Sequence, residues 1–241
     1  MGIASNRPSS AAESQNEYFG DSSVASFLKE IKVSDAANSR GDSSSQPGPN
    51  LPGTSRFAVD SCDLPSRQLA DYLLQCYFGK FHSLYPFIHK PSFLRMYDSL
   101  WTPTVVDVGN SSAGIGLGDP NVPSSTFLCA LNIVLALGCQ FSHLNHTARE
   151  ATSADIFERS QRYLNTLSRD KGDLALVQIL LLTATYLQGG ESPSKCWDMI
   201  GLACRIAQGL GMHSVKADRN RRPAEIQIRR RVWHGCIMMD L

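Results

Sequence analysis

Hydrophobic residues past position 63 recur with the period of α-helices, and alternation typical of strands is nearly absent. A first stripe begins near Leu69 and reaches Leu84, and Pro86 is expected to end that helix because proline lacks the backbone donor that the next turn needs. Further helices are predicted over 92–100, 127–141, 147–167, 174–188, 192–210 and from 225 onward. The pattern predicts an all-α fold, a multi-helix array of about seven to eight helices.

Polar residues and glycines at the edges of these stripes predict where helices begin and end. Thr147 and Glu150 have the spacing of a capping box, in which each side chain satisfies a free backbone donor. Asp173 is positioned to cap the next helix. Gly189 and Gly190 are expected to close that helix in left-handed geometry, and Gly211 is expected to end the helix predicted over 192–210.

The first 62 residues differ in amino-acid composition from the rest of the chain. They are rich in serine and poor in core residues, so segment 1–62 is predicted to be a mostly disordered tail. It contains a short amphipathic helix predicted over 21–33, which is expected to dock on its own domain or on a partner. Its apolar face contains Val24, Phe27, Leu28 and Ile31.

A second composition change interrupts the helical domain predicted over 63–241. Residues 102–125 are rich in Gly, Pro, Ser and Asn and are interpreted as a flexible loop. Gly114, Gly116 and Gly118 lie at spacing two, but the strand and helix that a phosphate-binding turn requires do not flank them.

Charge and cysteine content narrow the class of protein. The 241 residues contain 23 Lys and Arg against 22 Asp and Glu, so a net charge of +1 gives no general attraction for nucleic acid. Seven scattered cysteines favour a reduced intracellular protein over a disulfide scaffold. The longest apolar stretches are shorter than the roughly 20 residues of a membrane span, so no membrane association is expected.

No catalytic, cofactor-binding or metal-binding set is predicted. His143 and His146 lie three residues apart, but the sequence places no third ligand beside them. The cysteines are interpreted as small buried hydrophobic residues. One group of aromatic side chains could line a ligand pocket, although core packing is favoured for it. This group consists of Tyr77, Phe81, Tyr85 and Phe87.

The basic residues between positions 216 and 231 form a local excess of positive charge. Nucleic-acid contact, a nuclear-import signal and pairing within the fold are the three interpretations. Glu225 and Arg229 are four residues apart on one predicted helix, which favours pairing.

Four stretches together resemble the fungal-specific transcription factor domain, or middle homology region, of binuclear zinc-cluster regulators. They are YFGKFHSLYPFIHKPSF (Tyr77 to Phe93), LALVQILLLTATYLQG (Leu174 to Gly189), WDMIGLACRIAQGLGMH (Trp197 to His213) and the run from Glu225 to Asp240 that contains RRRVWHGCIMMD. Their order and spacing over roughly 64–241 carry the resemblance. Tyr18 to Ile31 is also similar to a segment that often precedes this domain.

The resemblance implies a nuclear, non-catalytic regulatory region that controls transcription. Its implied partners are the transcription machinery or co-regulator proteins, with a small-molecule effector as a further candidate. Zinc and DNA binding would belong to a separate six-cysteine cluster, which this sequence lacks. The residues placed at structural positions of the family motifs are Trp197, Gly201, Arg205, Gly211, His213, Arg229, Arg230, Arg231, Trp233 and Asp240.

The sequence stops at Leu241 inside a helical pattern, so we expect a domain that is incomplete at its C-terminus. Trp233, Cys236 and Ile237 are the apolar residues expected to lack a partner there. Two other classes stay open: a free-standing helical adaptor or metabolite-binding module, and a metal-dependent helical enzyme that uses the histidines at 143 and 146 and a cysteine.

Overall fold

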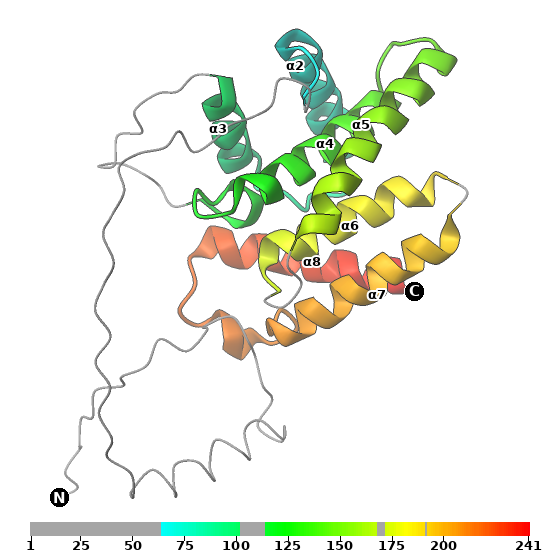
Figure 1. Cartoon of the computed structure of the whole chain (residues 1–241). Coiled ribbons are helices and arrows are strands. Elements are labelled where there is room, and N and C mark those ends of the chain that lie inside the picture. The colour runs from blue at the N-terminus through cyan, green and yellow to red at the C-terminus, as the bar shows by residue number, and fades with distance from the viewer. Residues whose placement is uncertain (1–63, 102–113, 168–171, 191) are drawn as a thin grey trace, which may run out of the picture.

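The computed structural model describes residues 64–101, 114–167, 172–190 and 192–241. Within these ranges the chain forms seven α-helices and no strand, which confirms the all-α prediction (Figure 1). The helices are α2 (Arg67–Cys76), α3 (Lys90–Trp101), α4 (Ser124–Gln140), α5 (His146–Thr166), α6 (Leu174–Gln188), α7 (Pro193–Gly209) and α8 (Pro223–Asp240). The predicted tail over 1–62, its helix over 21–33 and residues 102–113 lie outside the described residues.

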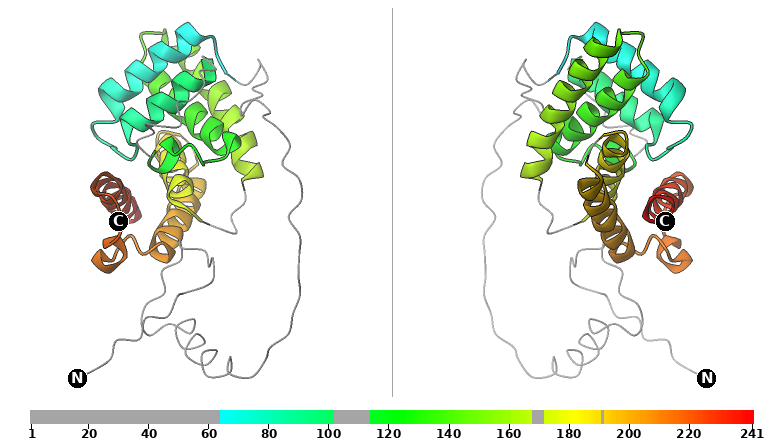
Figure 2. Two further views of the ribbon diagram at one scale, coloured as in Figure 1. Left: turned by 90° about the vertical axis from the view of Figure 1, so that its left-hand side faces the viewer. Right: turned by 90° about the vertical axis from the view of Figure 1, so that its right-hand side faces the viewer.

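The helices form two groups that meet where α4 contacts α6. Figure 2 shows α2, α3, α4 and α5 packed together on one side, with α6, α7 and α8 on the other. Residues 126–139 of α4 and 175–185 of α6 are buried without interruption. Both sequences are apolar around the whole helix, because each of these helices is surrounded by others.

α2 and α4 approach closely at a glycine. A Cβ atom built on Gly138 would lie 2.1 Å from the carbonyl oxygen of Leu73 in α2. No side chain fits in that space, so the two backbones can touch only because α4 has a glycine there. This contact fixes the first helix against the buried centre of the fold.

The first predicted helix is divided. The α-helical part of α2 ends at Cys76, and a π-helical turn, η1 (Tyr77–Phe81), follows it. The chain then turns, with the N–H groups of Leu84 and Tyr85 donating to the carbonyl of Phe81. The prediction that one continuous helix runs to Leu84 is therefore wrong, because the wider turn redirects the chain before Pro86.

The helix ends agree only in part with the sequence signals. Asp173 accepts a hydrogen bond from the N–H of Leu176 at 2.8 Å, as predicted for a cap. Asn145, rather than Thr147, caps α5 by accepting from Ala148. Gly211, the predicted helix stop, follows the end of α7 and has a left-handed φ of 68°. Gly189 has a φ of −81°, and Gly190 is not among the described glycines with positive φ, so the left-handed geometry predicted there is absent.

A buried amide joins two loops to the centre of the fold. The Gln178 Oε1 atom in α6 accepts a hydrogen bond from the N–H of Leu117 at 3.0 Å. Its Nε2 atom donates to the carbonyl of Phe87 at 2.5 Å. Gly116 has a φ of 54°, and a Cβ atom there would lie 2.2 Å from Gln178 Oε1. The glycine therefore lets the loop backbone reach the amide.

These bonds correct the interpretation of 102–125 as a flexible loop. Its later part contains a short 3₁₀ turn, η2 (Gly116–Gly118), in which Leu117 is fully buried. Gly118 also passes close to α3, because a Cβ atom on it would meet Ser92 Oγ at 2.2 Å. The glycines of this segment serve close packing, which composition alone did not distinguish from flexibility.

We expect Gln178→Leu to lower the free energy of unfolding by about 2–5 kcal/mol, since it leaves a buried N–H and a buried C=O without partners. Denaturant unfolding followed by circular dichroism measures this change. Gln208→Leu, on the exposed side of α7, is the matched control and should stay within about 0.5 kcal/mol of the parent. Equal stability of the two variants would contradict the assigned role of Gln178.

Candidate functional site

The aromatic residues of the first motif stack on one another between η1 and the turn after it. The ring centroids of Tyr77 and Phe81 are 5.3 Å apart, and those of Phe81 and Tyr85 are 5.1 Å apart. Phe87 continues the series, with its ring centroid 5.8 Å from that of Tyr85. These contacts are those of core packing, and ligand binding among the four rings stays a prediction.

α8 packs against this turn at a glycine. A Cβ atom on Gly235 would lie 2.3 Å from the ring of Phe87. The turn that holds Phe87 is in turn bonded to Gln178 of α6. The first and fourth sequence motifs, which are far apart in the chain, therefore meet at one place in the fold.

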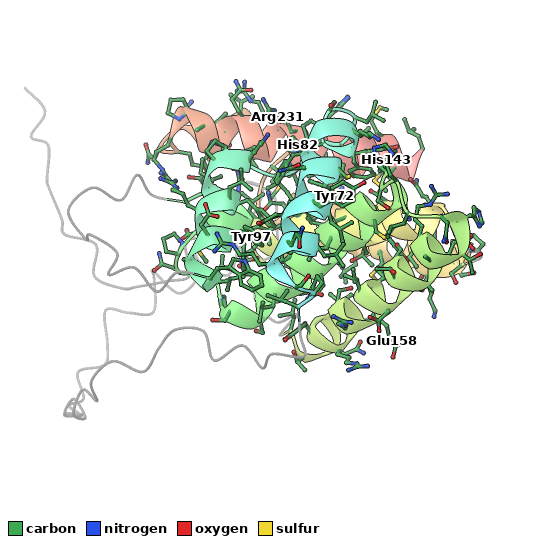
Figure 3. All side chains as sticks on the ribbon, turned by 90° about the horizontal axis from the view of Figure 1, so that it is seen from above. Tyr72, His82, Tyr97, His143, Glu158 and Arg231 are labelled. Atoms are coloured by element: carbon green, nitrogen blue, oxygen red, sulfur yellow. The ribbon has the colours of Figure 1, made fainter. Side chains whose placement is uncertain are left out.

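His82 lies at this meeting point, beside Arg231 of α8 (Figure 3). Burial and, to a smaller extent, the positive charges of Arg231 and Lys90 together lower its pKa to about 4. Its Nδ1 atom is buried and has no hydrogen-bond partner among the described residues. The imidazole is therefore neutral near pH 7.

A buried ion pair joins the end of α7 to α8. The Arg229 Nε atom lies 3.3 Å from Asp218 Oδ1, and the two side chains are only 3% and 8% exposed. Arg229 also donates from Nη2 to the carbonyl of Leu210 at 2.7 Å. Asp218 belongs to the 3₁₀ turn η3 (Val215–Asp218), which leads from α7 into α8. The ion pair therefore closes this connection.

The pairing predicted between Glu225 and Arg229 is wrong in its partners. Glu225 instead pairs with Arg221 at 2.6 Å, and Arg229 reaches back to Asp218 in η3. The interpretation that the cluster pairs within the fold holds for these arginines. Arg230 is also near Asp218, at 3.9 Å, but its side chain is 56% exposed.

The other motif residues have different surroundings. Trp197 of α7 is 72% exposed, and a Cβ atom on Gly201 would meet nothing within 4 Å. Arg205 and Asp240 are also exposed. The ring centroids of His213 and Trp233 are 5.9 Å apart. The structure thus brings together the motif residues around η3 and α8, and leaves those at the start of α7 at the surface.

The three apolar residues near the end of α8, Trp233, Cys236 and Ile237, also differ in their burial. Cys236 is fully buried, and Cys204 of α7 donates to its carbonyl oxygen at 3.6 Å. Trp233 is partly buried, whereas 41% of Ile237 is exposed. Of the three residues expected to lack partners, Cys236 and Trp233 find them within the described fold.

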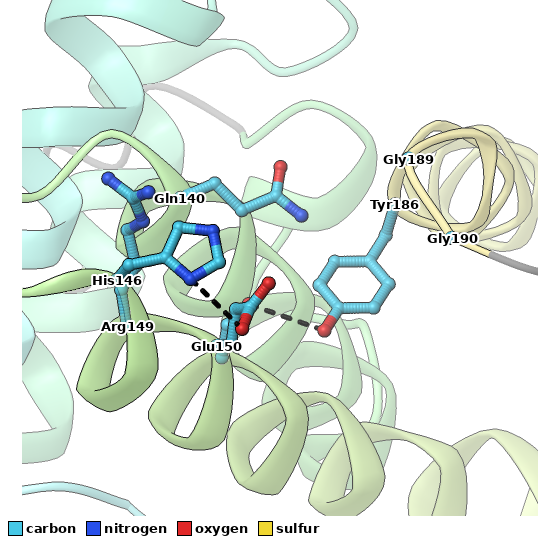
Figure 4. A pocket seen from close by; sticks show the side chains of 8 residues that line it. Gln140, His146, Arg149, Glu150, Tyr186, Gly189 and Gly190 are labelled. Carbon is cyan, nitrogen blue, oxygen red and sulfur yellow. Dashed lines mark hydrogen bonds and ion pairs between the residues drawn. The ribbon is translucent and has the colours of Figure 1, made fainter.

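A cleft opens between the end of α4, the start of α5 and the end of α6 (Figure 4). It has a volume of about 410 Å³. His146 and Glu150 form an ion pair at its rim, with 3.2 Å between Nδ1 and Oε2. Deeper inside, the hydroxyl groups of Ser153 and Tyr186 are 3.3 Å apart. A cleft of this size and polarity suits a small polar molecule.

The two histidines considered as metal ligands have separate partners. His146 lines the cleft, whereas the backbone N–H of His143 donates to the hydroxyl of Tyr72 at 2.8 Å. Among the described residues, no three His, Cys, Asp or Glu side chains are grouped so that they could hold a metal ion. Burial raises the pKa of the Cys129 thiol to about 12, and the burial of Cys139, Cys196 and Cys204 also raises their pKa values.

Together, these features define an all-helical domain whose motif arginines, glycines and aromatic residues hold separate helices together. The chain belongs to the family described as the fungal specific transcription factor domain, which matches residues 74–241. The family resemblance stated from the motifs is therefore confirmed. Within the described ranges, no helix is both long and apolar enough to cross a bilayer.

Known relatives are regulators of fungal genes. The chain is 28% identical over 196 residues to sorbicillinoid biosynthetic cluster transcription factor 2 of Penicillium rubens, covering 79% of the chain and 27% of the relative. It is 26% identical over 190 residues to the acetamidase regulatory protein of Aspergillus fumigatus, covering 78% of the chain and 22% of the relative. The chain thus spans about a quarter of the length of these relatives. No solved structure matches it significantly.

We expect Arg229→Gln to lower the free energy of unfolding by about 3 kcal/mol, because it leaves the Asp218 carboxylate buried without its main partner. Chemical denaturation of the purified variants measures this loss. Arg230→Gln changes a neighbouring arginine near the same carboxylate but at the surface, so it should cost less than about 1 kcal/mol. A larger loss for Arg230→Gln than for Arg229→Gln would contradict the assignment.

The pKa of His82 predicts a dependence of stability on pH. Between the ordinary value of 6.5 and the folded value of about 4, the unfolded chain binds a proton that the folded chain does not. The contribution of His82 to the free energy of unfolding is therefore complete above pH 6.5 and is lost as the pH is lowered toward 4. In His82→Gln this part of the fall should disappear, whereas the exposed control His234→Gln should keep it. Unfolding free energies at pH 7 and pH 5 measure the difference.

Proposed function

We propose that this chain is the regulatory region of a nuclear fungal transcription factor and acts without catalysis of its own. The family match over 74–241 carries the proposal, because it covers nearly the whole folded part of the chain. The two relatives described above are named a transcription factor and a regulatory protein, which agrees with such a role.

The proposed mechanism is a packed helical array that restrains or presents a surface used in transcription. Its partners would be the transcription machinery or co-regulator proteins. DNA and zinc would be bound by a separate zinc cluster of the whole protein, since no described residues group as metal ligands. Arg221 pairs with Glu225, and Arg229 pairs with Asp218. These ion pairs within the fold support a structural use of the basic residues rather than direct DNA contact.

The cleft between α4, α5 and α6 supports a second role, the binding of a small-molecule effector. It is formed by residues from three helices, so a ligand there would bias how these helices pack. Such a ligand would raise the melting temperature of the protein in a concentration-dependent way. A screen of polar metabolites against the parent and Tyr186→Leu would detect it and assign it to the cleft.

A reporter assay tests the regulatory role. We expect that placing the chain between a heterologous DNA-binding domain and an activation domain changes reporter output several-fold relative to a direct fusion. Arg229→Gln, which loosens the fold, should reverse the change, and Arg230→Gln should leave it intact. Immunoblots control for protein amount. Output equal to that of the direct fusion would contradict a regulatory role.

A further inference from the structure

Positive charge collects around the turn that follows η1. Lys90 at the start of α3 places Nζ 5.1 Å from the ring centroid of Phe78, and that centroid is 5.2 Å from that of His82. Arg231 of α8 also lies near His82. Cationic side chains from two helices, which are separate in the sequence, thus converge on one surface.

His89, at the end of the turn, reports the same positive surroundings. Burial lowers its pKa, and the charges of Arg95, Arg231 and Arg222 contribute in the same direction. Its ring nitrogen is 2.9 Å from Ser92 Oγ, so it is held in place beside α3. Both histidines of the turn therefore lie in a positive field that three elements of the fold create.

Two of these cations have no carboxylate partner among the described residues. Asp218 and Glu225 pair with arginines elsewhere on α8 or before it, whereas neither Lys90 nor Arg231 lies within 4 Å of any described carboxylate oxygen. Both side chains are exposed. Lys90 and Arg231 both act electrostatically on His82, and an acidic partner would offset the positive charge that they concentrate at this surface.

The turn also exposes an apolar side chain. Leu84 is two residues after His82 and is 72% exposed, although its neighbours Phe81 and Phe87 are buried. An exposed leucine two residues from a histidine that lies near two cations suits a segment with both carboxylates and apolar residues. We call the surface formed by His82, Leu84, Lys90 and Arg231 the basic turn face.

The chain itself contains such a segment. Residues 13–35 carry five carboxylates against two lysines. Three of them, Glu13, Glu17 and Asp21, precede the apolar stripe that begins at Val24. This segment lies outside the described residues. Its sequence combines negative charge, which complements the cations of the basic turn face, with apolar residues that could cover Leu84.

We propose that residues 13–35 dock on the basic turn face of their own domain, with Glu17 and Asp21 against Lys90 and Arg231 and the apolar stripe over Leu84. This interaction is independent of the proposed function. It assigns an intramolecular partner to the surface where the first and fourth sequence motifs meet.

The intervening chain is long enough for this contact. A flexible coil with as many residues as lie between positions 36 and 63 would have an end-to-end distance of roughly 30 Å, comparable with the width of the domain. A tether of this length gives an effective concentration on the order of millimolar. A weak charge-assisted contact is therefore enough to keep the segment bound.

Duplex DNA is a less suitable occupant. Protein–DNA complexes neutralise about six to ten phosphates, whereas the basic turn face has two cations without carboxylate partners among the described residues. An exposed leucine also contributes little to the binding of a phosphate backbone. DNA and a second copy of the chain are distinguished from the tethered segment by the experiment below.

Hydrogen exchange on the full chain tests the proposal. We expect amides within 21–33 to exchange about tenfold more slowly than the same residues in a free peptide 13–35. Lys90→Glu combined with Arg231→Glu should return the exchange rates to those of the peptide. Adding Glu17→Lys and Asp21→Lys to that double variant should restore the protection, because the charges are then exchanged across the same contact.

The controls separate docking from other causes. Lys195→Glu reverses one charge at an exposed position of α7 and should leave protection unchanged, and circular dichroism verifies that each variant is folded. Equal protection in the parent and in the Lys90/Arg231 variant would overturn the proposal, as would exchange already as fast as in the peptide. Protection that falls on tenfold dilution would instead assign the face to a second copy. Displacement of the segment by duplex DNA at physiological salt would assign it to nucleic acid.

Discussion

One buried amide ties the parts of this domain together. Gln178 lies inside the apolar helix α6, yet it satisfies backbone groups of two segments that lie outside the α-helices. A buried polar group without partners is costly, so α6 and the two bonded backbone segments each hold the others in position. The hydrogen bonds of Gln178 thereby set the positions of Gly116 and of the Phe87 ring.

The ion pair around Asp218 has a comparable role between α7 and α8. A buried pair contributes little net stability compared with well-packed apolar residues, but it tolerates few alternative arrangements. Here it sets how η3 turns the chain from α7 into α8, and so where α8 presents Arg231. The fold thereby places the fourth motif beside the first, and the family resemblance reflects that common position.

Local signals predicted the helices well, and contacts distant in sequence were missed. Asp173 and Gly211 act on neighbouring residues, so their roles follow from spacing alone. Gln178 is separated from its two partners by 61 and 91 residues, and within an apolar run it has no periodic signature. Thr147 was mistaken for a cap because Asn145, two residues earlier, has equal chemistry. Spacing cannot decide which of two suitable side chains meets the helix end.

The π-helical turn at Tyr77–Phe81 limits how this region can vary in length. A turn of this kind takes up one residue more than an α-helical turn, and each residue of a helix rotates the chain by about 100°. Deleting a single position can therefore be absorbed, because the turn becomes an ordinary α-helical turn and the following chain keeps its direction. A further inserted residue would instead rotate every following side chain by about 100° relative to α8, so homologous proteins should accept a one-residue gap here more readily than an insertion.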